Sequence, residues 1–249
     1  MQKKGRIKRV DPLLIVDQLE VSSKALVPLM KKFSFQIFPG EIVALTGASG
    51  CGKSLTANAV VGLLEDGCEV TNGRIYYKGQ SLSQNDEKSW QTLRRDEISL
   101  LIQHSLSGLN PLQSVKKQML RTLKQKTEPA KKERMNYLRD LLRQVGFSNP
   151  ERILSSYPFQ LSGGMCQRIL LAMMISLQPT LLIADEPTTA LDSVNKEKLL
   201  ALLKKLQQEH GLTILLISHD VERISAFADR IIDMEAREEV RTCFLNYKG

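Results

Sequence analysis

The sequence predicts a mixed α/β fold with a parallel sheet at its centre. Over the last third of the chain, short apolar runs typical of buried strands alternate with segments typical of helices. Strands and helices in this alternating order indicate parallel strands with helices on both faces of the sheet. A β-rich segment precedes this core, and a long stretch rich in Leu, Lys, Arg, Gln and Met interrupts it. We therefore expect an α/β core with an N-terminal antiparallel β layer and an inserted helical subdomain.

The predicted β layer opens with two strands. Residues 13–20 and 33–37 alternate apolar and polar side chains, as half-buried strands do, and Pro39-Gly40 then turns the chain. Residues 41–46 form an apolar run that predicts a buried strand. Two further β segments lie at residues 73–77 and 98–102.

The helical stretch runs from about Ser114 to Gln178. Its residues favour helices, and we place the inserted subdomain at about residues 112–178. Breaks between its helices are expected at Pro129, Gly146, Pro150 and Pro158.

The core resumes after this insertion with strand and helix in turn. The predicted strands are residues 180–184, 213–217 and 230–233, and the helices between them are residues 194–209 and 221–228.

Length and composition favour one compact unit. At 249 residues the chain is expected to form a single domain from residue 13 to residue 249, preceded by a basic tail at residues 1–12. No apolar run approaches the ~20 residues that cross a bilayer, and the basic N-terminus has no signal-peptide pattern, so we expect a cytosolic polypeptide. Neither metal-ligand spacing nor a disulfide framework is indicated by the four cysteines, Cys51, Cys68, Cys166 and Cys243.

A formal net charge of +8 is compatible with nucleic acid, with an anionic membrane face or with a solvated surface. Five of the first nine residues are basic, but no aromatic residue is interleaved with them. The region matches no nucleic-acid recognition module, so we expect no nucleic-acid partner.

One motif predicts a nucleoside triphosphate and Mg²⁺. Residues 47–54 read Gly-Ala-Ser-Gly-Cys-Gly-Lys-Ser and fit G-x-x-x-x-G-K-[ST] without a gap. Glycines let main-chain N–H groups converge on one anion, Lys53 reaches the β- and γ-phosphates, and the Ser54 hydroxyl can ligate the metal. The nucleotide contacts expected from this loop are Gly47, Ser49, Gly50, Cys51, Gly52, Lys53, Ser54 and Leu55.

Two acids follow the apolar run at residues 181–184. Ligands of open α/β sheets bind at the carboxyl ends of strands, so Asp185 and Glu186 should emerge beside the phosphate loop. Asp185 suits the Mg²⁺ shell, and Glu186 suits activation of the attacking water. The alternative is that both acids merely end a strand before Pro187.

A Ser162-Gly163-Gly164 turn opens an apolar helix further along the chain. It places a hydroxyl and free N–H groups at the positive end of a helix dipole, which makes a second anion site. One nucleotide cannot easily use both sites.

The turn resembles the signature loop of ATP-binding cassette (ABC) ATPases, and the order of motifs from about Leu14 to Asp233 is similar to that family's. The resemblance implies a P-loop NTPase core of the ABC type, in which two subunits face head to tail and each signature loop completes the other's ATP site.

The resemblance assigns three further residues. Gln103 is similar to the glutamine-loop residue that senses Mg²⁺ and the γ-phosphate, and Asp192 lies in the loop that crosses to the partner subunit. His219 is similar to the switch histidine that holds the γ-phosphate. The resemblance thus implies Glu186, His219 and Gln103 as catalytic residues and Ser54, Gln103 and Asp185 as metal ligands.

Residues 109–112, 157–165 and 184–192 resemble the ATPases of the oligopeptide, dipeptide and nickel importers. This implies ATP hydrolysis coupled to uptake of peptides or nickel and other metal complexes, at the cytoplasmic face of the inner membrane. The implied partners are a second, related ATPase subunit, two transmembrane permease subunits and an extracytoplasmic substrate-binding protein. A homodimer of this chain is the alternative to the heterodimer. A soluble ATPase of a non-transport assembly, such as a carbon–phosphorus lyase component, is the alternative function.

Two departures from the family pattern affect these expectations. The family stacks adenine on an aromatic residue between the first two strands, but residues 22–27 contain none, so we expect the base to rely on Leu26 and Val27. Members of the subfamily usually continue past the last core strand. This chain stops at Gly249, soon after Asp233, so we expect no regulatory tail of that type.

Overall fold

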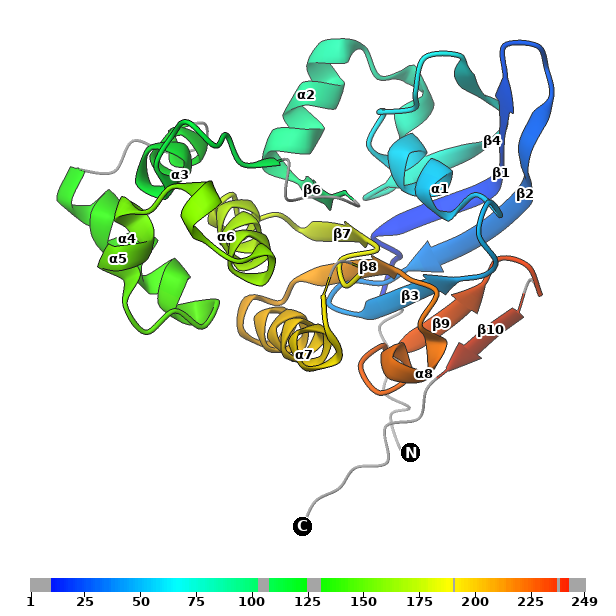
Figure 1. Cartoon of the computed structure of the whole chain (residues 1–249). Helices are drawn as coiled ribbons and strands as arrows, with labels where there is room; N and C mark the ends of the chain where they lie inside the picture. The colour runs from blue at the N-terminus through cyan, green and yellow to red at the C-terminus, as the bar shows by residue number, and fades with distance from the viewer. Residues whose placement is uncertain (1–9, 103–107, 125–130, 190, 237, 242–249) are drawn as a thin grey trace, which may run out of the picture.

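The computed structural model of the chain describes residues 10–102, 108–124, 131–189, 191–236 and 238–241. Two sheets form one side of the molecule, and a cluster of helices extends from the other (Figure 1). The expected core, antiparallel layer and helical insertion are all present.

The N-terminal layer is an antiparallel sheet of four strands in the order β2-β1-β4-β5. β1 pairs with both β2 and β4 along most of its length. The strands are β1 (Leu14–Ser23), β2 (Pro28–Ile37), β4 (Cys68–Tyr77) and β5 (Gln80–Ser81).

Two of these strands begin earlier than the sequence pattern indicated. β2 starts at Pro28, where a proline is tolerated because β2 lies at the sheet edge. β4 contains Gly73 in its interior, with a φ of +86°. A Cβ at Gly73 would lie 2.3 Å from the Gln18 carbonyl oxygen, where the β1–β4 register shifts. Gly73 therefore marks a bulge inside the strand and not the start of the strand.

The central sheet has six strands in the order β10-β9-β3-β8-β7-β6, and its first five strands along the chain are parallel. β10 was not expected, and it pairs antiparallel with β9. The strands are β3 (Ile42–Thr46), β6 (Ile98–Leu101), β7 (Leu181–Asp185), β8 (Thr213–Ile217), β9 (Arg230–Asp233) and β10 (Glu238–Arg241).

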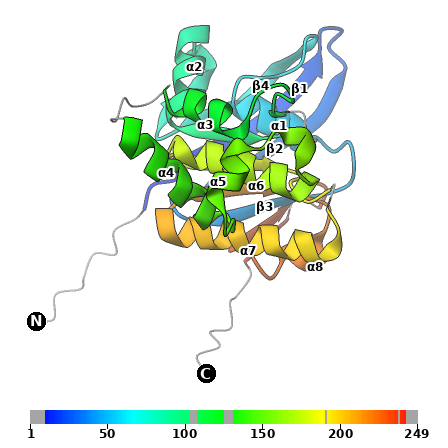
Figure 2. The same ribbon diagram turned by 60° about the vertical axis from the view of Figure 1, so that its left-hand side comes forward.

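Both faces of the central sheet are buried. Along β7, Leu182 and Ala184 pack with the helical side, whereas Leu181 and Ile183 pack toward α1 and the antiparallel sheet. This alternation explains why the strand sequences are apolar throughout. In a view turned by 60°, helices α3 to α6 come forward, and α7 runs below them (Figure 2). No helix of the described residues is long and apolar enough to cross a membrane.

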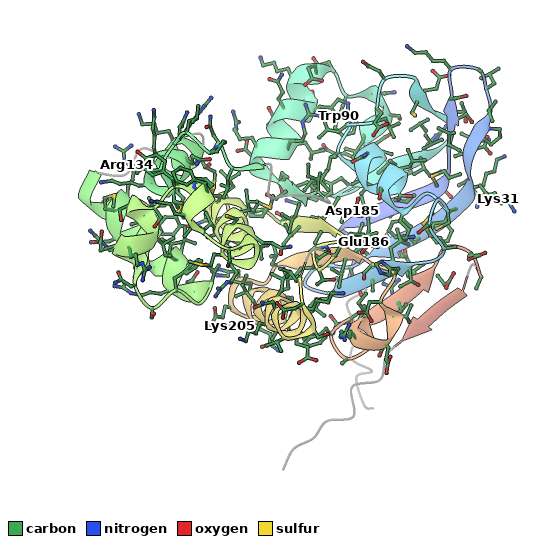
Figure 3. All side chains as sticks on the ribbon, viewed as in Figure 1. Lys31, Trp90, Arg134, Asp185, Glu186 and Lys205 are labelled. Atoms are coloured by element: carbon green, nitrogen blue, oxygen red, sulfur yellow. The ribbon has the colours of Figure 1, made fainter. Side chains whose placement is uncertain are left out.

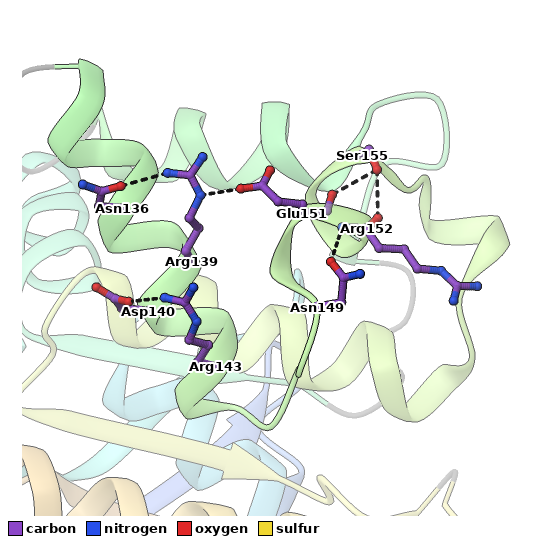
Figure 4. A network of polar contacts seen from close by, with 8 residues as sticks. All are labelled: Asn136, Arg139, Asp140, Arg143, Asn149, Glu151, Arg152 and Ser155. Carbon is purple, nitrogen blue, oxygen red and sulfur yellow. Dashed lines mark hydrogen bonds and ion pairs between the residues drawn. The ribbon is translucent and has the colours of Figure 1, made fainter.

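Eight α-helices are present in the described residues. Those of the insertion are α3 (Val115–Leu123), α4 (Lys131–Gln144), α5 (Pro150–Ser155) and α6 (Gly163–Ser176), and the others are α1 (Lys53–Val60), α2 (Glu87–Asp96), α7 (Ser193–His210) and α8 (Val221–Ile224). Polar contacts join α4 to α5 (Figure 4), and both helices also contribute side chains to a buried apolar core. Arg139 of α4 forms an ion pair with Glu151 of α5, and Asn149 caps α5 by accepting from the Arg152 N–H at 3.2 Å.

The sequence pattern missed α2 and extended α8 too far. α2 has no fully buried residue and offers only Trp90 and Leu93 as large apolar side chains, but Asp86 caps it and Trp90 packs on Gly62. α8 ends at Ile224, four residues before the expected end.

Candidate functional site

The phosphate loop, residues 47–54, joins the end of β3 to the start of α1. Three of its glycines have positive φ values, namely Gly47, Gly50 and Gly52, at +135°, +81° and +109°. At Gly52 a Cβ would lie 2.6 Å from the Met30 Cβ, so the loop packs against β2 where only glycine fits. The glycines therefore give the loop the curvature on which an anion-binding main chain depends.

Lys53 lies across this loop. Its side chain is largely buried, and the ammonium donates to the Gly47 and Ala48 carbonyl oxygens, each at 2.8 Å. The Cys51 Sγ lies 3.8 Å from the same nitrogen. The cation is thus held at the concave side of the loop, where phosphate oxygens would bind.

Asp185 ends β7, two strands away from β3. Its side chain is buried, and Oδ1 has no hydrogen-bond partner among the described residues. Burial raises the pKa of this carboxyl above its ordinary value of 3.8, and the neighbouring Glu186 raises it further, whereas Ser54 and Lys53 lower it. A buried, unpartnered carboxylate oxygen next to the Ser54 hydroxyl fits a hard divalent cation.

Glu186 follows directly and points toward His219, which comes just after β8 (Figure 3 labels both acids). The Glu186 Oε1 lies 2.8 Å from the His219 Nδ1, and Oε2 accepts from the Thr189 hydroxyl at 3.0 Å. The glutamate N–H donates to the Ile217 carbonyl oxygen at 2.9 Å. Glu186 has a φ of +47°, a strained conformation that typically occurs at functional sites.

The carboxyl ends of β3, β7 and β8 therefore bring the predicted residues together, since the three strands are neighbours in the sheet. Lys53 follows β3, Asp185 and Glu186 end β7, and His219 follows β8. Ser49 lies exposed in the loop, and Leu55 packs partly against the core.

The Ser162-Gly163-Gly164 turn opens α6, as the sequence predicted. Ser162 is the N-cap residue, and its hydroxyl accepts from the Met165 N–H at 3.4 Å. A Cβ at Gly164 would contact the Leu191 side chain at 3.6 Å, so this turn packs against the segment before α7.

Asp192 caps α7, with Oδ1 accepting from the Asn195 N–H at 3.0 Å. This hydrogen bond lowers the pKa of the Asp192 carboxyl. Gln103 and Ala190 lie outside the described residues.

A cavity of about 520 Å³ adjoins the phosphate loop. It lies between the start of β2, the loop and the turn after β9, and none of the described residues that line it is aromatic. Leu26 and Val27 are exposed but are not among the lining residues, so the expected reliance on them has no support in this geometry. The lining residues are Pro28, Leu29, Met30, Lys31, Lys32, Gly50, Cys51, Met234 and Glu235.

Residues 30–189 match the ABC transporter family, over more than half of the chain. The chain belongs to the ABC transporter family. This confirms the resemblance noted in its motifs, and the phosphate loop and signature turn lie within the matched segment.

Curated relatives of this ABC cassette are transport ATP-binding proteins. The dipeptide transport protein DppD of Escherichia coli is 37% identical over 92% of this chain and 71% of its own length. The oligopeptide transport protein AppD of Bacillus subtilis is 40% identical over 84% of this chain and 64% of its own length. The peptidoglycan transport protein YejF of Agrobacterium fabrum is 37% identical over 93% of the chain. This chain spans only 43% of the length of YejF.

Solved ABC cassettes share the fold. CbiO1 of Clostridium perfringens, part of the ABC transporter complex CbiONQ, superposes with a TM-score of 0.79 at 25% identity, covering 90% of this chain and 84% of CbiO1. The dimeric cassette MJ0796, in a post-hydrolysis state bound to ADP and Pi, superposes with a TM-score of 0.78 at 28% identity. The match covers 92% of this chain and 98% of MJ0796.

Two contacts in this ABC cassette were missed in the sequence. Gln167, buried on α6, donates through its amide to the Pro187 carbonyl oxygen and so links the signature helix to the loop after β7. Thr189 orients Glu186. A glutamine near the start of a largely apolar helix is the signal that could have indicated the first contact.

Proposed function

We propose that this chain is the ATP-hydrolysing subunit of an ABC importer that takes up peptides or metal complexes such as nickel chelates. The observation that carries the proposal is the cluster of Lys53, Asp185, Glu186 and His219 at adjacent strand ends. The names of the relatives support an importer over a non-transport assembly.

In this proposal the phosphate loop binds the triphosphate. Lys53 turns from the Gly47 and Ala48 carbonyls toward the β- and γ-oxygens, to which an ammonium binds as a point charge. Ser54 and Asp185 hold Mg²⁺, together with Gln103, which lies outside the described residues. When bound, the metal ion neutralises charge that develops on the phosphates.

Glu186 is the proposed base. Its carboxylate accepts the proton of the attacking water, while His219 and Thr189 fix its two oxygens. His219 is more exposed than Glu186, with 62% of its side-chain surface accessible against 11%. It is therefore free to exchange its bond with Glu186 for one with the γ-phosphate.

The second half of each site comes from a partner subunit in this proposal. Ser162, Gly163 and Gly164 would bind the γ-phosphate held by the partner's phosphate loop, and Asp192 would face the partner. The dimeric cassette among the structural neighbours supports this arrangement. We propose that the partner ATPase is a related but different chain. The complex would also contain two permease subunits and an extracytoplasmic binding protein, and this chain would lie at the cytoplasmic face of the inner membrane.

The test is Glu186→Gln in the assembled transporter. We expect ATP to bind but hydrolysis to fall by about 10²- to 10⁴-fold, because an amide cannot accept the proton of the water. The matched control is Glu209→Gln, an exposed residue at the end of α7. Wild-type turnover in Glu186→Gln would reject the proposed base. Failure of the chain to co-purify with membrane proteins from detergent-solubilised membranes would reject the importer.

A further inference from the structure

Arg223 connects two segments that leave the neighbouring strands β7 and β8. It lies on α8, four residues after His219, which itself follows β8. The Arg223 Nη1 atom donates to the Asp220 Oδ2 atom at 2.6 Å, and its Nη2 atom donates to the Ser193 hydroxyl at 3.4 Å. Ser193 is the first residue of α7, and Figure 2 shows α8 close to this end of α7. These two contacts, the Arg223 bridge, therefore join the segment after β8 to the start of α7.

The Asp220 end of the bridge is fixed directly beside His219. The Asp220 N–H donates to the hydroxyl of Ser218, a buried residue, at 3.1 Å, and the Asp220 Oδ1 atom accepts from the Arg223 N–H at 3.4 Å. Burial alone would raise the pKa of the Asp220 carboxyl, but hydrogen bonds and charge from Arg223, with the charge of Lys196, lower it below 3.8. The carboxylate thus stays charged, and the main chain of His219 is held between two bonded residues.

The Ser193 end of the bridge adjoins the connection between β7 and α7. This connection carries the proposed base, Glu186, and the hydroxyl of Thr189 that bonds to it. Asp192, which we propose faces the partner subunit, caps α7 and directly precedes Ser193. The bridge therefore links the His219 segment to the part of this chain that would meet the partner.

The junction around the bridge is closely packed. A cavity of about 10 Å³ lies there, and a space of that size holds about one water molecule at most. Its lining comes from both segments and includes Thr188, Lys196, Ser218, Asp220 and Arg223. Because close-packed side chains transmit displacement, a shift of one segment moves the other.

We propose that Arg223 is a positioning residue for ATP hydrolysis: its bridge sets the position of His219 relative to the partner-facing Asp192. When the partner displaces Asp192, the bridge passes that displacement to the His219 segment and aligns the imidazole with the γ-phosphate. This inference rests on the proposed function, because it acts through the proposed roles of His219 and Asp192. Arginine suits the task because its planar fork holds two donors at a fixed angle, whereas lysine offers a compact point charge.

The experiment compares Arg223→Lys and Ser193→Ala with the wild type in the assembled transporter. Lysine keeps a charge beside Asp220, and alanine is a good helix former, but each change breaks the link between residues 223 and 193. We expect kcat for ATP hydrolysis to fall by about 3- to 30-fold in each variant. The Kd of the full chain for ATP, measured by isothermal titration, should stay at the wild-type value. The double variant should be no slower than the slower single variant, because both changes remove one contact.

A second comparison tests whether His219 is the group that the bridge positions. Adding Arg223→Lys to His219→Ala should cause no further loss of turnover, because the side chain to be positioned is already absent. Single-turnover hydrolysis with enzyme in excess measures these low rates. A residue that only stabilised the fold would lower turnover by the same factor with and without the histidine.

Arg143 provides the matched control. Like Arg223, it pairs with an aspartate three residues earlier, Asp140, at 2.7 Å (Figure 4). Arg143→Lys should therefore hydrolyse ATP at the wild-type rate. Ser155→Ala on α5 controls for the loss of a hydroxyl and should also keep that rate. Thermal melts establish that each variant is folded.

Three results would overturn the inference. The first is wild-type turnover in both bridge variants. The second is an ATP affinity that falls in parallel with kcat, since Arg223 would then act on binding or on the fold. The third is full additivity of Arg223→Lys with His219→Ala. Glu186→Gln is measured in parallel: if it is inactive while the bridge variants are fully active, the bridge alone is wrong, whereas wild-type turnover in Glu186→Gln rejects the proposed base itself.

Discussion

The Nδ1 atom of His219 lies 2.8 Å from the Oε1 atom of Glu186. His219, just after β8, therefore orients the glutamate that follows the neighbouring strand β7. Thr189 holds the other carboxylate oxygen at 3.0 Å. With both oxygens held, the carboxylate has one defined position despite the strained backbone beneath it. Such fixed geometry is what a general base requires.

This pair predicts the effect of His219→Ala. Without the imidazole, Glu186 keeps Thr189 but loses its second partner, so we expect turnover to fall by about 10²-fold or more while ATP binding persists. Steady-state hydrolysis and nucleotide titrations measure the two effects separately. His210→Ala at the end of α7 is the control and should retain activity. Equal losses in both variants would mean that the histidine at 219 has no special part in the reaction.

Lys53→Ala should weaken triphosphate binding by about 10- to 100-fold, because a hydrogen bond from a charged group contributes about 1.5–3 kcal/mol. The buried ammonium bonds two loop carbonyls, so the variant also leaves these acceptors unpaired. Isothermal titration with magnesium nucleotides gives the affinity, and thermal unfolding reports the cost to the loop. Unchanged ATP affinity would count against the assignment of the phosphate site.

Asp185→Asn tests the raised pKa of the buried carboxyl. A carboxyl whose pKa is raised on folding stabilises the folded state at acid pH. This stabilisation is lost as the pH rises above 3.8, the ordinary pKa of the Asp185 carboxyl, and through its raised pKa in the folded chain. An amide has no charge to bury, so the nucleotide-free variant should melt at a higher temperature than the wild type near pH 8. Magnesium-dependent hydrolysis should be lost.

The difference in melting temperature should shrink as the pH is lowered toward the ordinary pKa of the carboxyl. Thermal melts across this range measure it. A variant that is less stable than the wild type at every pH would show that the Asp185 carboxylate is already compensated in the folded chain.

How much of this site could be seen in the sequence depends on how local each signal is. The glycines of the phosphate loop form one contiguous motif, and Asp185 and Glu186 directly follow an apolar run, so both features could be recognised from short stretches of sequence. The bulge at Gly73 depends on Gln18 of another strand, and α2 is held by Trp90 against Gly62. These tertiary contacts leave no periodic pattern, and the strand boundary and the helix were therefore missed.

Ser162→Arg tests the proposed two-subunit site. The serine caps α6 from a surface-facing turn, so a long cation there should leave nucleotide binding by this chain intact. In the assembled pair it should reduce hydrolysis at the site built on the partner's phosphate loop. Binding is followed with a fluorescent ATP analogue, and Ser155→Arg on α5 is the control. Loss of nucleotide from this chain's own loop, with the partner's site intact, would contradict the arrangement.

The last prediction concerns the nucleotide base. The cavity beside the phosphate loop is lined by Met30, Cys51 and Met234 among others, and the described part of the chain contributes no aromatic ring to it. We therefore expect GTP to compete with ATP within about tenfold, since aromatic stacking that contributes about 1–3 kcal/mol is missing. Val27→Tyr places a ring directly before Pro28, the first lining residue, and should tighten ATP binding by about 5- to 100-fold. Ala25→Tyr, further from the cavity, is the control. A hundredfold preference of the wild type for ATP over GTP would mean that an aromatic residue reaches the base from a partner subunit or from a rearranged β2.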